Sequence, residues 1–170
     1  MTELKRGFSL IEMLVVIGAM GILMVAAYPS ILNTLENRGL DSSARGIQTS
    51  LQAAKFQAVN TKLNHRVRFD NSTGPWTYVI EREETTGNWV RMPKFLPRTI
   101  PGKYTVTVTL PDVPAARTVV FDSVGLVANF DTSKKTISLQ SPKLKRFGQP
   151  DLRTVVFYYG GTIQYIKSST

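Results

Sequence analysis

A single acidic residue, Glu12, lies within an otherwise uncharged and mostly apolar run from Phe8 to Tyr28. A carboxylate inside hydrocarbon costs about 2.5–3.5 kcal/mol, so it needs a cationic partner or a function. The junction just upstream offers both. Gly7 gives an unhindered backbone that a protease can grip, and a cut there would remove the basic leader and leave a positive amine near Glu12. The alternative is that Glu12, four residues from Phe8, only snorkels toward the near interface.

The run from Phe8 to Tyr28 is long enough to cross a bilayer. Its 21 residues form a helix of about 30 Å, which matches the hydrocarbon core. Lys5 and Arg6 precede the run and Arg38 is the first basic residue after it. This asymmetry predicts a cytoplasmic leader and an exported remainder. A cleaved secretory signal fits less well, because the run is longer than such an apolar region and no small-residue cleavage site follows promptly.

We divide the chain into a leader over 1–7, a transmembrane helix over 8–28, an amphipathic helix continuation over 29–62 and a globular head over 63–170. Pro29 removes one helical hydrogen bond, so we expect a kink or a locally melted turn there. Beyond it, apolar residues recur at helical spacing to about Lys62. The run from Gly39 to Ser43 has the residue types of a helix break followed by a new N-cap.

From Asn64 onward the apolar period changes to two, which indicates strands. We expect strands over 65–69, 76–82, 89–91, 104–110, 118–121, 126–130, 136–140, 153–158 and 162–166. Gly160 and Gly161 provide the turn of the last hairpin, and three prolines between 93 and 101 interrupt one crossing. A series of strands after one long helix predicts an α+β fold, with the helix packed on an antiparallel β-sheet head.

The stretch Lys5-Arg6-Gly7-Phe8-Ser9-Leu10-Ile11-Glu12 resembles the class III leader junction of type IV pilins and type II secretion pseudopilins. The resemblance implies cleavage between Gly7 and Phe8 by a prepilin peptidase, N-methylation of Phe8, and a role for Glu12 in filament assembly. It also implies a bacterial inner-membrane protein with a cytoplasmic N-terminus and a periplasmic head. Its implied partners are the lipid bilayer, an inner-membrane assembly platform and other pilins or pseudopilins in a hetero-oligomeric filament.

The head resembles that of the GspH/FimT minor pseudopilins. The resemblance lies in the run from Val119 to Gly125 and in a last hairpin from Val155 to Gly161. The favoured hypothesis is therefore a minor subunit of a type II secretion pseudopilus or a type IV pilus. The alternative is a membrane-anchored minor pilin that binds DNA for natural transformation. DNA-binding members of that group carry a C-terminal Gly-Arg-x-Arg motif, whereas this chain has Gly161-Thr162-Ile163-Gln164 there.

The formal net charge is +9, and excess positive charge attracts nucleic acid, anionic lipid or acidic protein faces. Two candidate basic surfaces follow: the first contains Lys143, Lys145, Arg146 and Arg153 on or near an expected loop, and the second contains Arg91, Lys94, Arg98 and Lys103. A solvated surface or a contact with an acidic neighbouring subunit is favoured for these residues, and DNA binding is the alternative.

Residues for catalysis are scarce. The chain has no cysteine, and His65 is its only histidine, which excludes thiolate and His-rich metal sites. We expect His65 at the rim or edge of a strand. No glycine-rich phosphate-binding motif is present. The sequence predicts a non-enzyme with no catalytic residue, metal or cofactor.

Overall fold

The computed structural model describes residues 8–72, 74–113 and 116–170. The leader over 1–7, including Gly7 of the expected cleavage junction, lies outside the described residues. The chain divides after Leu35 into two compact units, of which the second runs from Glu36 to Thr170.

Helix α1 spans Leu10–Thr61 and ends close to the expected residue 62. Every residue in it is helical, Pro29 included, and the kink expected at Pro29 stays a prediction. The break expected over Gly39 to Ser43 is wrong. Leu40 and Ala44 are fully buried in the core on this stretch, and their packing outweighs the cost of about 1 kcal/mol for a glycine in a helix.

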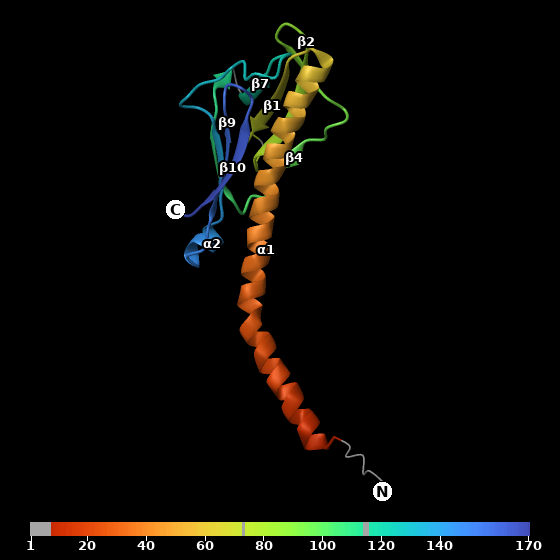
Figure 1. Cartoon of the computed structure of the whole chain (residues 1–170), viewed down its shortest axis with the longest axis vertical. Coiled ribbons are helices and arrows are strands. Elements are labelled where there is room, and N and C mark those ends of the chain that lie inside the picture. The colour runs from red at the N-terminus through yellow and green to blue at the C-terminus, as the bar shows by residue number, and fades with distance from the viewer. Residues whose placement is uncertain (1–7, 73, 114–115) are drawn as a thin grey trace. The chain divides into compact units, whose positions relative to one another are not determined.

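The second unit also contains two antiparallel sheets (Figure 1). The strands of the first sheet are β1 His65–Asp70, β2 Thr77–Thr85, β3 Asn88–Arg91, β4 Arg98–Thr99, β6 Asp112–Val113 and β7 Ala116–Phe121. Their order is β3-β2-β1-β7-β6, and β4 pairs with β2. The strands of the second sheet are β5 Thr105–Thr109, β8 Thr136–Gln140, β9 Leu152–Phe157 and β10 Ile163–Ser168, in the order β10-β9-β8-β5. The expected α+β fold is confirmed.

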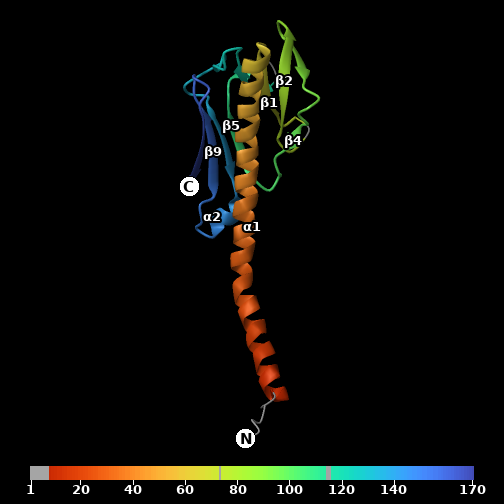
Figure 2. The same cartoon turned by 45° about the vertical axis from the view of Figure 1, so that its right-hand side comes forward.

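The core lies where the later part of α1 meets both sheets. The buried residues of this helix stripe follow a three- and four-residue spacing: Leu40, Ala44, Ile47, Leu51, Ala54 and Ala58. Phe69 of β1, Phe121 of β7 and Phe157 of β9 belong to the same core. In Figure 2, β5 and β9 lie to one side of this part of α1, and β1, β2 and β4 lie to the other. One helix face therefore serves both sheets.

Two glycines in α1 lie where tyrosine side chains approach the helix. A Cβ added at Gly39 would lie 2.7 Å from the hydroxyl oxygen of Tyr104, and one at Gly46 would lie 2.9 Å from that of Tyr78. Real Cβ atoms do not come so close to other atoms, so any larger residue at either position must displace the tyrosine. Glycine disfavours the helix locally but here permits close packing of the helix against the head.

The strand expected over 126–130 does not form. The side chain of Asp122 accepts hydrogen bonds from the N–H groups of Val124 and Leu126, at 3.0 and 2.9 Å, and this produces a turn. The Asn129 side chain then makes the hydrogen bonds to β7 that the backbone of a paired strand would make. It accepts from the Val120 N–H and donates to the Thr118 carbonyl, both at 2.9 Å. Side-chain hydrogen bonds to the backbone have displaced strand pairing here.

Candidate functional site

The first turn of α1 contains Glu12 and is capped by Ser9. The Glu12 N–H donates to Ser9 Oγ over 3.2 Å, and the Met13 N–H donates to the Ser9 carbonyl at 3.2 Å. A Ser-x-x-Glu spacing before an apolar run is the signature of a helix N-terminus, so Ser9 to Glu12 carried a sequence signal for the start of α1. The Glu12 carboxylate is thus at the end of α1 where the helix dipole favours negative charge.

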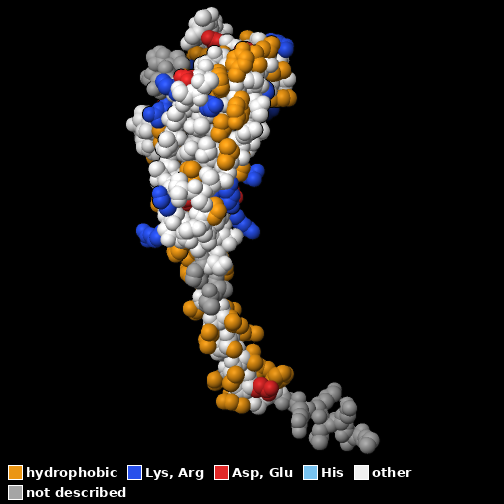
Figure 3. Space-filling model, turned by 60° about the vertical axis from the view of Figure 1, so that its left-hand side comes forward, with side chains coloured by type: hydrophobic (Ala, Val, Ile, Leu, Met, Phe, Trp, Pro, Cys, Tyr) orange, Lys and Arg blue, Asp and Glu red, His pale blue; other side chains and the backbone are white. Residues whose placement is uncertain are grey.

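The helical segment after Phe8 exposes its apolar side chains. Every residue from Phe8 to Val25 is exposed; Leu10, for example, is 85% exposed and Val25 76%. Figure 3 shows hydrophobic side chains over this segment. By length and composition, α1 can cross a membrane. An apolar surface of this extent needs lipid or other apolar helices around it.

Arg153 does not belong to the expected basic surface, because its side chain is fully buried. It is bonded to the Asp41 carboxylate of α1 and donates to Asn37 Oδ1 at 3.0 Å. It also donates to the carbonyls of Pro150 and Leu152, at 2.9 and 3.1 Å. This guanidinium therefore joins β9 to α1 inside the head.

The carboxylate that faces Arg153 has a second partner. The Tyr165 hydroxyl donates to Asp41 Oδ1 at 2.8 Å, and Arg45 stacks over the Tyr165 ring at 4.7 Å from its centroid. Burial by itself would raise the pKa of Asp41, but the hydrogen bonds from Arg153 and Tyr165 lower that pKa below its ordinary value. Asp41 is therefore held as an anion.

The other three residues of the first basic surface lie together. Lys143, Lys145 and Arg146 are exposed on the short helix α2, Pro142–Arg146, where we expected a loop. Ser141 caps α2, accepting a hydrogen bond from the Leu144 N–H at 3.4 Å. Serine followed by proline is a typical helix start, so the sequence carried a signal for α2.

Lys103 of the second basic surface forms an ion pair within the head. Lys103 Nζ lies 2.8 Å from a Glu36 carboxylate oxygen, and the Ser141 hydroxyl donates to the other Glu36 oxygen at 3.0 Å. Glu36 thus connects the start of the second unit to both α2 and the segment before β5. Lys103 is therefore not a free cation for a ligand.

His65 is buried on β1 and not at a rim, because β1 lies between β2 and β7 and directs His65, Val67 and Phe69 inward. Its Nδ1 lies 2.9 Å from the Leu63 carbonyl oxygen. Burial lowers the pKa of His65, and the nearby Arg82 charge lowers it further. His65 is thus a neutral core residue. In the described part of the chain, no group of His, Asp and Glu side chains is arranged to hold a metal.

Residues 4–28 match the family model described as the prokaryotic N-terminal methylation motif. The N-terminal segment therefore carries this methylation motif. Two structures of the minor pseudopilin EpsH from the type II secretion system of Vibrio cholerae resemble the fold of this chain. The first is 15% identical with a TM-score of 0.57 and covers 75% of this chain and 96% of EpsH. The second is 13% identical with a TM-score of 0.52, covering 78% and 96%. A search of curated proteins finds no match.

The two segments that carried the GspH/FimT resemblance touch each other in the head. Gly161 has φ +71°, and a Cβ added to it would lie 2.3 Å from the Gly125 carbonyl oxygen. The Val127 N–H donates to the Tyr159 carbonyl at 2.9 Å. Lys55 Nζ of α1 completes the contact by donating to the Gly161 carbonyl at 3.0 Å. The loop after β7 and the last hairpin therefore form one packed unit with α1.

Proposed function

We propose that this protein is a minor pseudopilin or minor pilin of the GspH/FimT type, a structural subunit of a type II secretion pseudopilus or a type IV pilus. The N-terminal methylation motif at residues 4–28 carries the proposal. The fold shared with EpsH, a type II secretion minor pseudopilin, supports it. The function is mechanical, and it uses no catalytic residue and no cofactor.

In this proposal the subunit is first inserted in the inner membrane. A prepilin peptidase cuts between Gly7 and Phe8, and the new Phe8 amine is methylated. Residues 8–28 span the bilayer once, residues 29–62 continue the helix, and the head over 63–170 lies in the periplasm. The inner-membrane assembly platform then transfers the subunit to a filament with other pilins or pseudopilins.

Assembly follows from burial of the exposed helix surface. In the membrane the side chains from Phe8 to Val25 contact lipid, and in the filament they contact the equivalent helices of neighbouring subunits. Gly18 and Gly21 have no side chain of their own and no other atom within 4 Å of an added Cβ, so another helix can approach there. Glu12 pairs with a Phe8 amine of its own subunit or of a neighbour. An unpaired Glu12 is costly in this apolar setting, so pairing selects the axial position.

Processing is the first test. We expect the native membrane form to begin at Phe8 and to carry one methyl group on its amine, as measured by mass spectrometry of the intact protein. Gly7→Ala should leave most of the protein with its leader attached, because a Cβ hinders the protease at the cleavage site. Gly18→Ala is the matched control and should be processed normally. A native form that begins at Met1 or Thr2 would exclude the filament-subunit function.

Assembly is the second test. Glu12→Gln removes the charge but keeps the shape, so we expect normal cleavage and about tenfold or greater loss of incorporation into filaments, since a charge-assisted hydrogen bond contributes about 1.5–3 kcal/mol. Incorporation is measured in sheared filament fractions against the membrane pool. Ser9→Ala is the control: it removes the helix cap and retains the charge. Equal incorporation of Glu12→Gln and the native chain would contradict the pairing.

The DNA-receptor alternative has weaker support. Burial of Arg153 leaves Lys143, Lys145 and Arg146 as the first basic surface. Three exposed cations on one short helix fit an acidic face of a neighbouring subunit as well as they fit DNA. Both arginines of the Gly-Arg-x-Arg motif are absent from Gly161-Thr162-Ile163-Gln164, and we therefore favour the structural function.

A further inference from the structure

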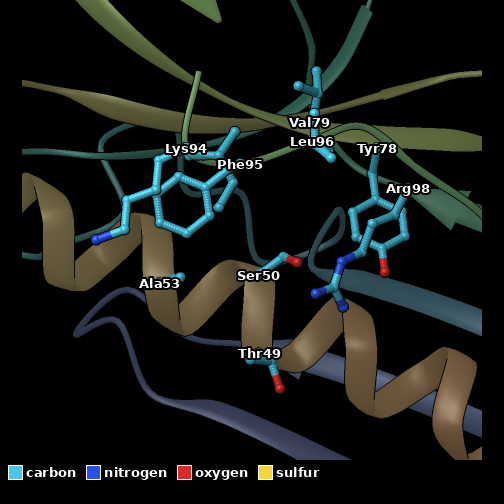
Figure 4. A pocket seen from close by; sticks show the side chains of 10 residues that line it. Thr49, Ser50, Ala53, Tyr78, Val79, Lys94, Phe95, Leu96 and Arg98 are labelled. Carbon is cyan, nitrogen blue, oxygen red and sulfur yellow. The ribbon is translucent and has the colours of Figure 1, made fainter. Parts of the chain in front are cut away.

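A hollow of about 330 Å³ lies between α1 and the segment over 92–97 that connects β3 to β4. This segment is called the strap. Figure 4 shows side chains of the hollow's lining: Ser50 and Ala53 on α1, Tyr78 and Val79 on β2, Lys94, Phe95 and Leu96 on the strap, and Arg98 at the start of β4. The volume is at the lower end of the range of about 300–1,000 Å³ for small-ligand sites. All of its residues belong to the second unit.

The pairing of β2 explains why the hollow exists. β3 pairs with β2 from Glu81 onward, and β4 pairs with β2 only at Thr77 and Tyr78. Between these two pairings the strap leaves the sheet and passes over Val79 and Ile80. Pro93 and Pro97 flank it, and each proline lacks an N–H for the sheet and has a fixed φ. The strap therefore cannot collapse onto β2 as a regular strand.

One end of the hollow is polar and cationic. The Tyr78 hydroxyl and the Arg98 guanidinium approach the same point of α1, because a Cβ added at Gly46 would lie 2.9 Å from the hydroxyl oxygen and 3.6 Å from a guanidinium nitrogen. In Figure 4, Arg98 and Tyr78 both extend toward α1 beside Ser50. Burial raises the pKa of Tyr78 despite the Arg98 charge, so its hydroxyl stays protonated. A guanidinium has five N–H donors, so Arg98 can bind a carboxylate with two parallel hydrogen bonds.

The other end of the hollow is apolar. Phe95 and Ala53 face it beneath Leu96 and Val79 (Figure 4). Leu96 is 75% exposed, a large apolar side chain at the lip that a bound apolar group would shield from water. The ten described residues that line the hollow include two cations, Lys94 and Arg98, and no carboxylate. The charge of the site therefore favours an anion.

We propose that this hollow binds a carboxylate attached to a compact apolar body, with Arg98 holding the carboxylate and Phe95, Leu96 and Ala53 surrounding the body. A free aliphatic or aromatic acid has this chemistry. The last residue of a polypeptide that ends in an apolar side chain has it too. The proposal does not depend on filament assembly, because it uses only residues of the head.

The experiment uses the full chain in lipid nanodiscs and ligand-observed saturation-transfer NMR, with phenylacetate as the probe and phenylacetamide as its uncharged match. We expect phenylacetate to bind, and we expect the amide to bind about tenfold or more weakly, since it lacks the charge-assisted pair. Arg98→Gln should weaken the binding of phenylacetate by a similar factor. Lys143→Gln removes one cation from α2 and should leave binding unchanged.

A second variant tests the apolar end. Ala53→Phe fills the hollow without altering its charge and should abolish phenylacetate binding, while the melting temperature shows that the head still folds. Equal binding of phenylacetate and phenylacetamide would overturn the proposal. So would full binding by Arg98→Gln, or a signal no larger than that of empty nanodiscs at millimolar probe.

The source of the ligand is settled by two further probes. Acetyl-Gly-Phe with a free carboxylate and its C-terminal amide are compared with phenylacetate. Tighter binding of the free-carboxylate peptide than of phenylacetate assigns a polypeptide end as the ligand. Weaker binding assigns a free organic acid. Either order supports the carboxylate site, whereas equal binding of the peptide acid and its amide contradicts it.

Discussion

Replacing Arg153 with leucine is expected to lower the free energy of unfolding of the head by about 3 kcal/mol. The change removes a buried cation and leaves the Asp41 carboxylate without its ion-pair partner, and breaking a buried pair from one side costs about 3–5 kcal/mol. The low end of that range applies because the Asp41 side chain is 34% exposed, so water can partly replace the lost partner. Asn37 also loses the donor that now lies 3.0 Å from its Oδ1.

Urea unfolding of the full chain, followed by tryptophan fluorescence, measures this effect. Lys145→Leu is the matched control, because Lys145 is exposed on α2 and a surface substitution of this kind changes stability by no more than about 0.5 kcal/mol. Arg153→Leu combined with Asp41→Asn should recover part of the loss, since the second change removes the unpaired charge. An Arg153→Leu midpoint equal to that of the control would show that the pair does not hold α1 to β9.

The second large effect is expected at the last hairpin. Gly161→Ala should lower the free energy of unfolding by about 2–4 kcal/mol, because two costs add. A residue with a Cβ at φ +71° is strained by about 1–3 kcal/mol. The new methyl group would also lie 2.3 Å from the backbone oxygen of Gly125, and neither backbone can move without opening the contact between the hairpin and the loop after β7.

The adjacent glycine gives the control for this prediction. Gly160→Ala makes the same chemical change one residue earlier, where an added Cβ meets no atom within 4 Å and φ is not in the left-handed region. We expect its unfolding midpoint to remain close to that of the native chain. If the two alanine variants unfold at the same urea concentration, the hairpin contact does not contribute to stability.

Periodic patterns predicted most of the fold. The three- and four-residue spacing from Ile47 to Ala58 gave the later part of the buried helix face, whereas Ile31 and Leu35 of the same pattern are exposed. The alternation around Val106 and Val108 gave β5. These patterns can be recognised from neighbouring residues alone, because the spacing of apolar residues along a helix or strand shows which face is buried. Gly39 misled the prediction of a break, because glycine is needed there for the approach of Tyr104 from a distant segment.

The site residues were predictable in unequal measure. Phe8 and Glu12 stood out because a charge in an apolar run is informative by itself. Arg153 was assigned to the surface by its charge, although it alternates with Val155 and Phe157 on the inward face of β9. That spacing was the available signal. The hollow beside Arg98 had no local signal, because it arises from where β3 and β4 stop pairing with β2.

The close approach of Tyr104 to Gly39 and of Tyr78 to Gly46 on α1 has a mechanical consequence. Each glycine receives the tip of one tyrosine, and the two glycines are spaced about two helical turns apart. Lengthwise sliding of α1 against the strands would force both phenol rings over bulkier neighbours at the same time. A pull that enters the helix at Glu36 is therefore resisted in shear at two points, and the strands are dragged along without slippage.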